Sequence, residues 1–317
     1  MPDSGSTKTE RDVQPLFRKL SFFNGLLLAG AILTAHAWLI ALPNRSDRPA
    51  SLAAVHYAPI RLNQAGFAPF TLVGAWIVTV GDDRFGGVSA LAVDKGRLLA
   101  LTDSGTQLSL PKPGRHGPAI VRDLPDGPGS AAFKRNRDSE ALARDPRGRG
   151  WWVAFEQSHQ LWLYDADFRR VLGRIELGRH RWRSNKGIEA MVPAGAGLLL
   201  FPEGGDEELA VGSGPVDARR LENPFGRLSD AAEMPDGRTL LVGRRLRMGG
   251  FENRLLIRRV TERGIVMSQF ASLAMRRRDN VEAIAAQPHA GGTRLWLMTD
   301  NDFRPRGPTL LVAFDLP

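Results

Sequence analysis

Cysteine is absent from this chain of 317 residues, and tyrosine occurs only twice beside fifteen phenylalanines and seven tryptophans. Without cysteine the protein has no disulfide bond and no thiolate metal site. Several catalytic signatures are also missing, since the sequence contains no P-loop, no G-x-G-x-x-G, no H-E-x-x-H and no G-x-S-x-G. These absences argue against the common nucleotide-binding, zinc-protease and serine-esterase classes.

Negative charge is the scarcer sign, because 43 lysines and arginines face 34 acids and leave a net charge of +9. The basic residues are spread along the chain, and no nucleic-acid motif with interleaved aromatic residues is present. This pattern indicates a solvated, arginine-rich surface, and we expect no nucleic-acid partner.

The N-terminal segment is divided by composition. Residues 1–19 are polar and basic, and residues 20–43 have no formal charge after Leu20, which is long enough for a membrane-spanning helix. Arg11, Arg18 and Lys19 precede this stretch, so the positive-inside rule places the following chain outside the cytoplasm. We therefore predict an inner-membrane anchor and a periplasmic protein. A signal peptide cleaved after "AHA" (35–37), followed by secretion, and a buried core helix are the alternatives.

A short linker is expected over residues 44–56, and β-rich runs separated by Gly, Pro and Asp turns follow from residue 57 to 317. Five segments of this region place an acidic or hydroxyl residue before a small apolar run, and they recur every 41 to 52 residues. They align on Ser89, Glu140, Glu189, Asp230 and Glu282. This period is typical of propeller blades.

The predicted fold is therefore an all-β propeller of five four-stranded blades, preceded by one hydrophobic helix. A sixth, degenerate blade and a β-sandwich are the alternatives. The last repeat lacks an outer strand, and the apolar run at 70–80 has no repeat of its own. We expect this early strand to complete the last blade and close the ring.

Within each repeat the second strand returns antiparallel, so its end lies beside the start of the first strand. This predicts that five pairs meet at one end of the ring: Ser89/Asp103, Glu140/Glu156, Glu189/Glu203, Asp230/Arg244 and Glu282/Asp300. Clustered carboxylates are costly to bury unless they are paired or bind a metal. Oxygen ligands of this kind suit Ca²⁺ better than Mg²⁺. Turn caps and salt-bridge partners are the structural alternative for the same acids.

These residues also carry a family resemblance. The segments "RFGGVSALAVD", "RDSEALARD", "NKGIEAM", "DNVEAIAA" and "LWLMTDNDFRPRGPTLLVAFDL" are similar, in order, to the phytase-like family labelled "esterase-like activity of phytase". The resemblance covers roughly residues 70–317. It implies an exported propeller-like domain with hydrolase activity, and it adds Asp138 and Asn301 to the acid set and the step Asn185-Lys186-Gly187. The chain departs from the family where Ala141, Ala190 and Ala283 replace the usual glycine, and in the loop after Phe303.

Two functions fit this reading. The first is a metal-dependent hydrolase of phosphate or carboxylic esters, monomeric, with Ca²⁺ as cofactor and a small anionic ester as substrate. The second is a non-catalytic envelope module that binds a glycan, peptide or protein. The predicted catalytic residues are Glu140, Glu189 and Glu282; the predicted substrate-binding residues are Lys186, Arg137 and Arg304; the predicted metal ligands are Asp138, Glu156, Asp300, Asn301 and Asp103.

Overall fold

The computed structural model describes residues 48–178, 187–248, 250–276, 278–301 and 307–316. These residues form strands and turns, with two short 3₁₀ helices, η1 (Gln64–Phe67) and η2 (Lys134–Asn136), and no α-helix among them. The hydrophobic helix predicted over residues 20–43 lies outside the described residues. Within the described part, no helix has the length and apolar character that a membrane span requires.

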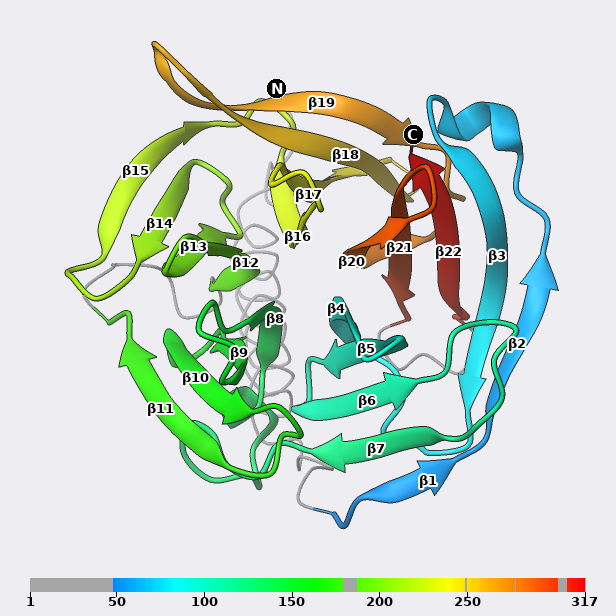
Figure 1. Ribbon diagram of the computed structural model, residues 1–317, viewed down its shortest axis with the longest axis horizontal. Coiled ribbons are helices and arrows are strands. Elements are labelled where there is room, and N and C mark those ends of the chain that lie inside the picture. The colour runs from blue at the N-terminus through cyan, green and yellow to red at the C-terminus, as the bar shows by residue number, and fades with distance from the viewer. Residues whose placement is uncertain (1–47, 179–186, 249, 277, 302–306, 317) are drawn as a thin grey trace, which may run out of the picture. The chain divides into compact units, whose positions relative to one another are not determined.

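The strands form antiparallel groups arranged around a centre, each running outward from an innermost strand (Figure 1). The first group is β4 (Val88–Asp94), β5 (Arg97–Thr102), β6 (Thr106–Leu110) and β7 (Ala119–Asp123), and the second is β8 (Ser139–Arg144), β9 (Gly150–Phe155), β10 (Gln160–Asp165) and β11 (Val171–Glu176). The third is β12 (Ile188–Ala194), β13 (Gly197–Pro202), β14 (Glu207–Val211) and β15 (Asp217–Glu222), and the fourth is β16 (Arg227–Glu233), β17 (Thr239–Arg247), β18 (Gly250–Thr261) and β19 (Gly264–Leu273). The last contains β20 (Asn280–His289), β21 (Gly292–Asp300) and β22 (Thr309–Leu316).

The last group is completed by the start of the described chain. Strand β3 (Thr71–Val80) pairs antiparallel with β22, which confirms the prediction that the run at 70–80 completes the final repeat. Strand β2 (Val55–Ile60) adds to β3, and β1 (Ser51–Ala53) adds to β7 of the first group. Sheet structure therefore begins at Ser51, inside the segment expected to be a linker.

The innermost strands close a ring, because β4, β8, β12, β16 and β20 each contact the next and β20 contacts β4 again. Hydrophobic side chains alternate between the two faces of each strand, so Trp151 packs toward the first group and Trp152 toward the third. The buried core is therefore divided into layers between neighbouring groups. This arrangement is a β-propeller, as predicted, and not a sandwich of two sheets.

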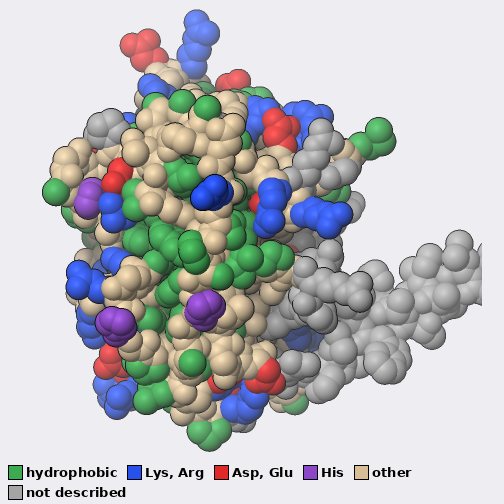
Figure 2. Space-filling model, turned by 90° about the vertical axis from the view of Figure 1, so that its right-hand side faces the viewer, with side chains coloured by type: hydrophobic (Ala, Val, Ile, Leu, Met, Phe, Trp, Pro, Cys, Tyr) green, Lys and Arg blue, Asp and Glu red, His purple; other side chains and the backbone are tan. Residues whose placement is uncertain are grey.

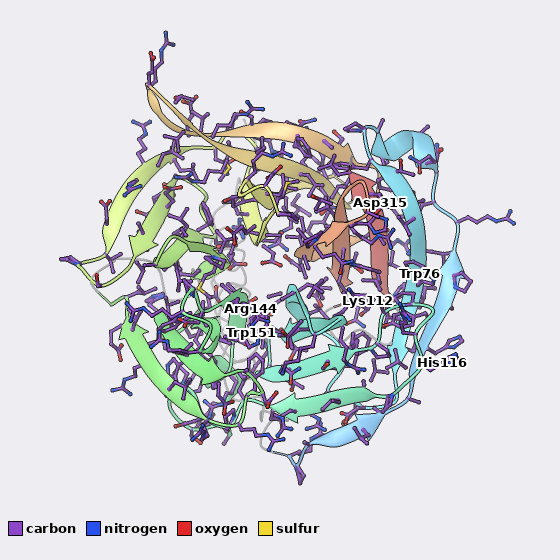
Figure 3. The ribbon with its side chains drawn as sticks, in the orientation of Figure 1. Trp76, Lys112, His116, Arg144, Trp151 and Asp315 are labelled. Atoms are coloured by element: carbon purple, nitrogen blue, oxygen red, sulfur yellow. The ribbon has the colours of Figure 1, made fainter. Side chains whose placement is uncertain are left out.

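The seam between the first and last groups is held by side chains of both. Lys112 bonds to Gln287 and lies 5.7 Å from the ring centroid of Trp296. The Tyr57 hydroxyl donates to the Pro111 carbonyl at 2.5 Å. Figure 3 shows Lys112 and Trp76 of β3 on this side of the ring. Figure 2 looks onto the same side, where hydrophobic side chains lie among basic ones.

All innermost strands begin at one end of the ring, where the second strands end. Asp300 pairs with Asn280, and Arg244 with Arg227, at this end. We call it the acid end, because the residues after the second strands include Asp103, Glu156 and Glu203. The prediction that the paired residues of every repeat lie at one end of the ring is thus confirmed.

Candidate functional site

Every innermost strand carries a β-bulge near its first residue. One residue is left out of the ladder with the second strand, and it is Ser89, Glu140, Glu189, Ser229 or Glu282 in turn. A bulge leaves its extra residue unpaired in the ladder and re-aims the side chain. The repeating residue seen in the sequence is therefore the bulge residue, and its recurrence has a backbone cause.

The fourth repeat corrects the sequence alignment by one residue. Ser229 occupies the bulge, whereas Asp230, which the alignment selected, pairs with Val242 in the ladder. The Asp230 carboxylate is buried and accepts hydrogen bonds from the backbone N–H groups of Ile284 at 2.7 Å, Ala231 at 2.8 Å and Leu91 at 3.4 Å. It therefore connects three innermost strands, β4, β16 and β20, and has a structural role.

The hydroxyl residues of the bulges are structural as well. Ser89 donates to the carbonyl of Ser139 at 2.7 Å, and Ser229 donates to the carbonyl of Val281 at 3.0 Å. Each bond links an innermost strand to its neighbour in the ring. Of the structural alternatives considered for the repeated residues, acceptance of backbone N–H groups applies to Asp230, whereas Ser89 donates to a carbonyl.

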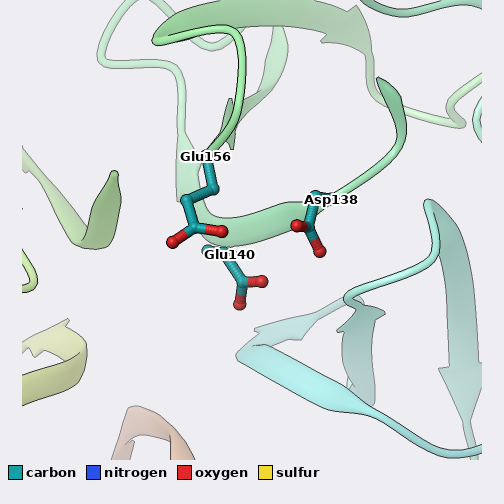
Figure 4. A group of neighbouring side chains, drawn as sticks. All are labelled: Asp138, Glu140 and Glu156. Carbon is teal, nitrogen blue, oxygen red and sulfur yellow. The ribbon is translucent and has the colours of Figure 1, made fainter. Parts of the chain in front are cut away.

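Three carboxylates gather at the acid end of the second group. Asp138 precedes β8, Glu140 is the bulge residue of β8, and Glu156 follows β9 (Figure 4). One oxygen from each lies within 4.8 Å of the others, so the three together are able to hold a metal ion. The Glu156 N–H donates to the Asp138 carbonyl at 2.9 Å, which fixes their relative positions. Gly187 permits this packing, because a Cβ there would lie 2.6 Å from the Glu156 Cα.

Glu189, the bulge residue of β12, extends this acidic group toward the third repeat. Burial, with the charges of Glu156 and Glu203, raises the pKa of Glu189 to about 8. Burial and the neighbouring Asp138 raise the pKa of Glu156 to about 7. The pKa of Glu140 also lies well above its ordinary value, through burial of its carboxyl and then the charges of Asp138 and Glu189. The group therefore retains protons near neutral pH unless a cation compensates its charge.

Basic side chains border the acids. The Lys134 ammonium lies 2.9 Å from Asp103 and 2.8 Å from Asp138. Burial alone would lower the pKa of Lys134, but the two carboxylates outweigh it and raise that pKa above its usual value. Arg244 pairs with Glu282 and donates to the Asn280 side chain at 3.0 Å. Each of these cations is thus paired with acids and offsets part of their charge.

The predicted site residues fall into three sets. Asp138, Glu140, Glu156 and Glu189 come together, and Asp103 joins them through Lys134. Glu282 instead forms an ion pair with Arg244, Asp300 lies opposite Asn280, and Asn301 accepts a bond from the Gly87 N–H at 3.4 Å. Lys186 and Arg304 lie outside the described residues.

Arg137, predicted to bind substrate, has a different environment. Its side chain is buried, and its guanidinium donates to the carbonyls of Pro128 at 3.0 Å and Asn136 at 2.9 Å. Arg137 therefore holds the loop before β8 in place. Its guanidinium faces backbone carbonyl oxygens of that loop. A buried arginine that satisfies loop carbonyls is not distinguished by sequence from one that faces a ligand.

The predicted catalytic, substrate-binding and metal-ligating residues did not include several residues that border the acids: Lys134, Glu203, Arg227, Arg244 and Asn280. Glu203 follows β13, and Arg244 occupies the corresponding repeated position within β17, so the repeat itself indicated their placement. Arg227 forms an ion pair with Glu203. Lys134 lies on η2, in the loop before β8, and it is not part of the repeating residue pattern.

The comparison with known families follows from these same segments. Residues 83–303 match the model of the phytase-like family, described as esterase-like activity of phytase. The chain belongs to the phytase-like family. The matched region of this phytase-like chain includes all five bulge residues and the acidic group. No curated protein matches the sequence.

Solved structures with similar architecture are distant in sequence. The phytase-like chain is 12% identical to the glutaminyl cyclase of Myxococcus xanthus, with a TM-score of 0.47 over 73% of this chain and 92% of that one. It is 13% identical to the allergen Mala s 1 of Malassezia sympodialis, with a TM-score of 0.46 over 81% and 92%. For the virginiamycin B lyase of Staphylococcus aureus the values are 8%, 0.45, 83% and 100%. Similarity at this level carries no information on activity.

Proposed function

We propose that this phytase-like protein is a five-bladed propeller that hydrolyses phosphate or carboxylic esters at its acid end with the help of a divalent cation. The observation that supports this most directly is the convergence of Asp138, Glu140 and Glu156, whose carboxylate oxygens lie within 4.8 Å of one another. In this proposal Glu140 is a metal ligand. Its neighbour Glu189 takes the acid–base role.

The donor set fits a hard cation. Carboxylate oxygens suit Ca²⁺ or Mg²⁺, and Ca²⁺ takes six to eight oxygen ligands, so water or substrate oxygens would complete the sphere. The raised pKa values of Glu140 and Glu156 support the same proposal, because a bound cation replaces the protons that otherwise separate the carboxylates. Lys134 and the metal ion would compete for the Asp138 carboxylate. If Asp138 binds the metal, Lys134 keeps Asp103 as its ion-pair partner. We propose Ca²⁺ as the resident ion.

Asp138, Glu140 and Glu156 would hold the cation, which would supply charge to polarise an ester oxygen or to activate a water molecule. Glu189, with a pKa raised to about 8, holds a proton that it can give to a leaving-group oxygen. Lys134 and Arg244 offset part of the negative charge of the acids. Arg227 pairs with Glu203, but its side chain is 61% exposed, and in this proposal it exchanges that partner for an anionic group of the substrate. A small anionic ester is therefore the substrate class we propose.

Export is part of the same proposal. The uncharged stretch after Leu20 and the basic residues before it support an inner-membrane anchor with the propeller in the periplasm. The acid end would then be exposed to the Ca²⁺ of the periplasm and not to that of the cytoplasm. We propose a monomer, because the ring closes on itself within one chain.

Isothermal titration calorimetry of Ca²⁺, Mg²⁺, Mn²⁺ and Zn²⁺ into the full-length protein tests the metal site. Glu140→Gln should abolish binding, whereas Glu262→Gln, an exposed carboxylate on the β18–β19 turn, should leave it unchanged. Titrations in buffers of different ionisation enthalpy should reveal proton release on binding near pH 7.

A panel of phosphate and carboxylic esters, assayed with the metal-replete protein, tests the chemistry. Turnover that is lost in both Glu140→Gln and Glu189→Gln supports the hydrolase. Saturable metal binding without turnover on any ester would instead favour the non-catalytic envelope module. If no divalent cation binds the unaltered protein, the metal-dependent mechanism is wrong.

A further inference from the structure

The hairpin between β17 and β18 exposes two large hydrophobic side chains, one of which is the most exposed among the described residues. Met248 is 96% exposed and Leu246 is 72% exposed. Arg245 and Arg247 alternate with them along the strand. Residues 244–254 contain four arginines and a single acid, Glu252, so the exposed apolar side chains lie in a positively charged setting.

This hairpin extends from the acid end of the ring. Strand β17 reaches the acid end at Arg244, which pairs with Glu282, and it continues three residues farther before the turn. Phe133, in the loop before β8, is also at this end and is 40% exposed, with the Arg135 guanidinium 5.1 Å from its ring centroid. Two loops from different repeats therefore present an apolar side chain beside an arginine at one end.

Apolar side chains that alternate with arginines suit the interface of an anionic bilayer. There the apolar groups enter the boundary between headgroups and acyl chains, while guanidinium groups bind lipid phosphates. Exposure of these apolar side chains to water contributes no favourable free energy. Exposed apolar groups rimmed by polar residues are typical of interaction surfaces. The chemistry of the hairpin alone does not separate a bilayer from a protein partner.

The chain that precedes the described residues favours the bilayer. The Arg48 N–H donates to Asp123 at 2.7 Å, and Asp123 ends β7, whose last residue lies at the acid end. Only residues 44–47 separate Arg48 from the hydrophobic stretch over 20–43, and four residues span at most about 14 Å. If that stretch is the membrane anchor proposed above, the tether joins the propeller at the same end as the hairpin.

We infer that the β17–β18 hairpin docks on the surface of an anionic bilayer and inserts Leu246 and Met248 into its interfacial layer. Arg247 lies next to both residues. It pairs with Glu252 at 3.3 Å, but its side chain is 58% exposed, so it is placed to contact lipid phosphates. This surface is separate from the acidic group. The inference uses the proposed anchor but does not require metal binding or turnover.

The absence of cysteine allows a site-specific test in the full-length protein. We would introduce Met248→Cys, attach an environment-sensitive fluorophore, and reconstitute the protein in vesicles of phosphatidylethanolamine and phosphatidylglycerol. Val260→Cys is the matched control, because Val260 is 70% exposed at the β18–β19 turn, away from the acid end. Spin-labelled lipids then report which position enters the bilayer.

The expected result is blue-shifted emission at position 248 and quenching about threefold stronger there than at position 260. Adding Arg247→Glu to the labelled protein should weaken this quenching, and replacing phosphatidylglycerol by phosphatidylcholine should do the same. Equally weak quenching at both positions would show that the hairpin stays in water and would overturn the inference. A blue shift at position 248 in the absence of lipid would also overturn it, because a second copy of the chain would then be the partner.

Discussion

Replacing Glu189 by glutamine is expected to stabilise the metal-free protein at about pH 8 and to leave its stability unchanged at about pH 4. Glu189 is only 9% exposed, and burial beside Glu156 and Glu203 raises its pKa to about 8. A raised carboxyl pKa stabilises the folded state while the proton is bound. That contribution is fully present below the unfolded pKa of about 4.5 and is lost as the pH rises through about 8.

The size of the effect follows from this interval. Each step of one pH unit between the unfolded pKa of 4.5 and the folded value of about 8 corresponds to about 1.4 kcal/mol, which sets a ceiling of about 5 kcal/mol. The neighbouring carboxyls Glu140 and Glu156 share the available protons, so we expect Glu189→Gln to recover about 1 to 3 kcal/mol at pH 8. Glutamine imitates the protonated acid, and the gain therefore vanishes in acid.

Urea unfolding with a chelator present, at about pH 4, 6 and 8, measures this directly. The exposed Glu262→Gln serves as the control and should show no pH-dependent change. A gain for Glu189→Gln that is equal at all three pH values, or a loss at pH 8, would refute the reasoning. Either result would show that ionisation of Glu189 does not destabilise the folded protein at pH 8.

Two further predictions concern buried acids that connect the repeats. Asp230→Ala removes the acceptor of three backbone N–H groups and is expected to cost about 3 kcal/mol or more in urea unfolding, whereas Asp230→Asn should cost less because it keeps one carbonyl oxygen. Arg258→Met leaves the fully buried Glu208 without the partner that lies 2.7 Å away and is expected to cost about 3 to 5 kcal/mol, most of which should return in the double variant Glu208→Leu/Arg258→Met. A double variant no more stable than the single one would contradict this account.

Much of the fold was predictable because it depends on local pattern. Alternating apolar residues, turn signals and a period near 50 residues are each set by short stretches of chain, and together they indicate a propeller. The closing strand was also predictable. The apolar run at 70–80 had no repeat of its own and the last repeat lacked an outer strand, so pairing the two satisfies both. The placement of Glu140 beside Glu156 followed from antiparallel pairing alone.

The details of the site were less predictable, because they depend on contacts between repeats. The bulge that places Ser229 rather than Asp230 in the repeated position is a matter of ladder register, which changes by one residue without altering composition. The role of Lys134 depends on a loop that brings it between Asp103 and Asp138. Arg137 and Arg244 both lie at the acid end, yet the first faces backbone carbonyls and the second faces Glu282.

The sequence by itself therefore determined the fold class, the family and the end of the ring at which the acids collect, because periodic residue types act through local strand and turn formation. Only the tertiary structure decided which acids share one group, which are neutralised by arginine, and which serve as struts such as Asp230. Those outcomes depend on distances of a few ångströms between different repeats, and the free energy of a buried charge changes steeply over such distances.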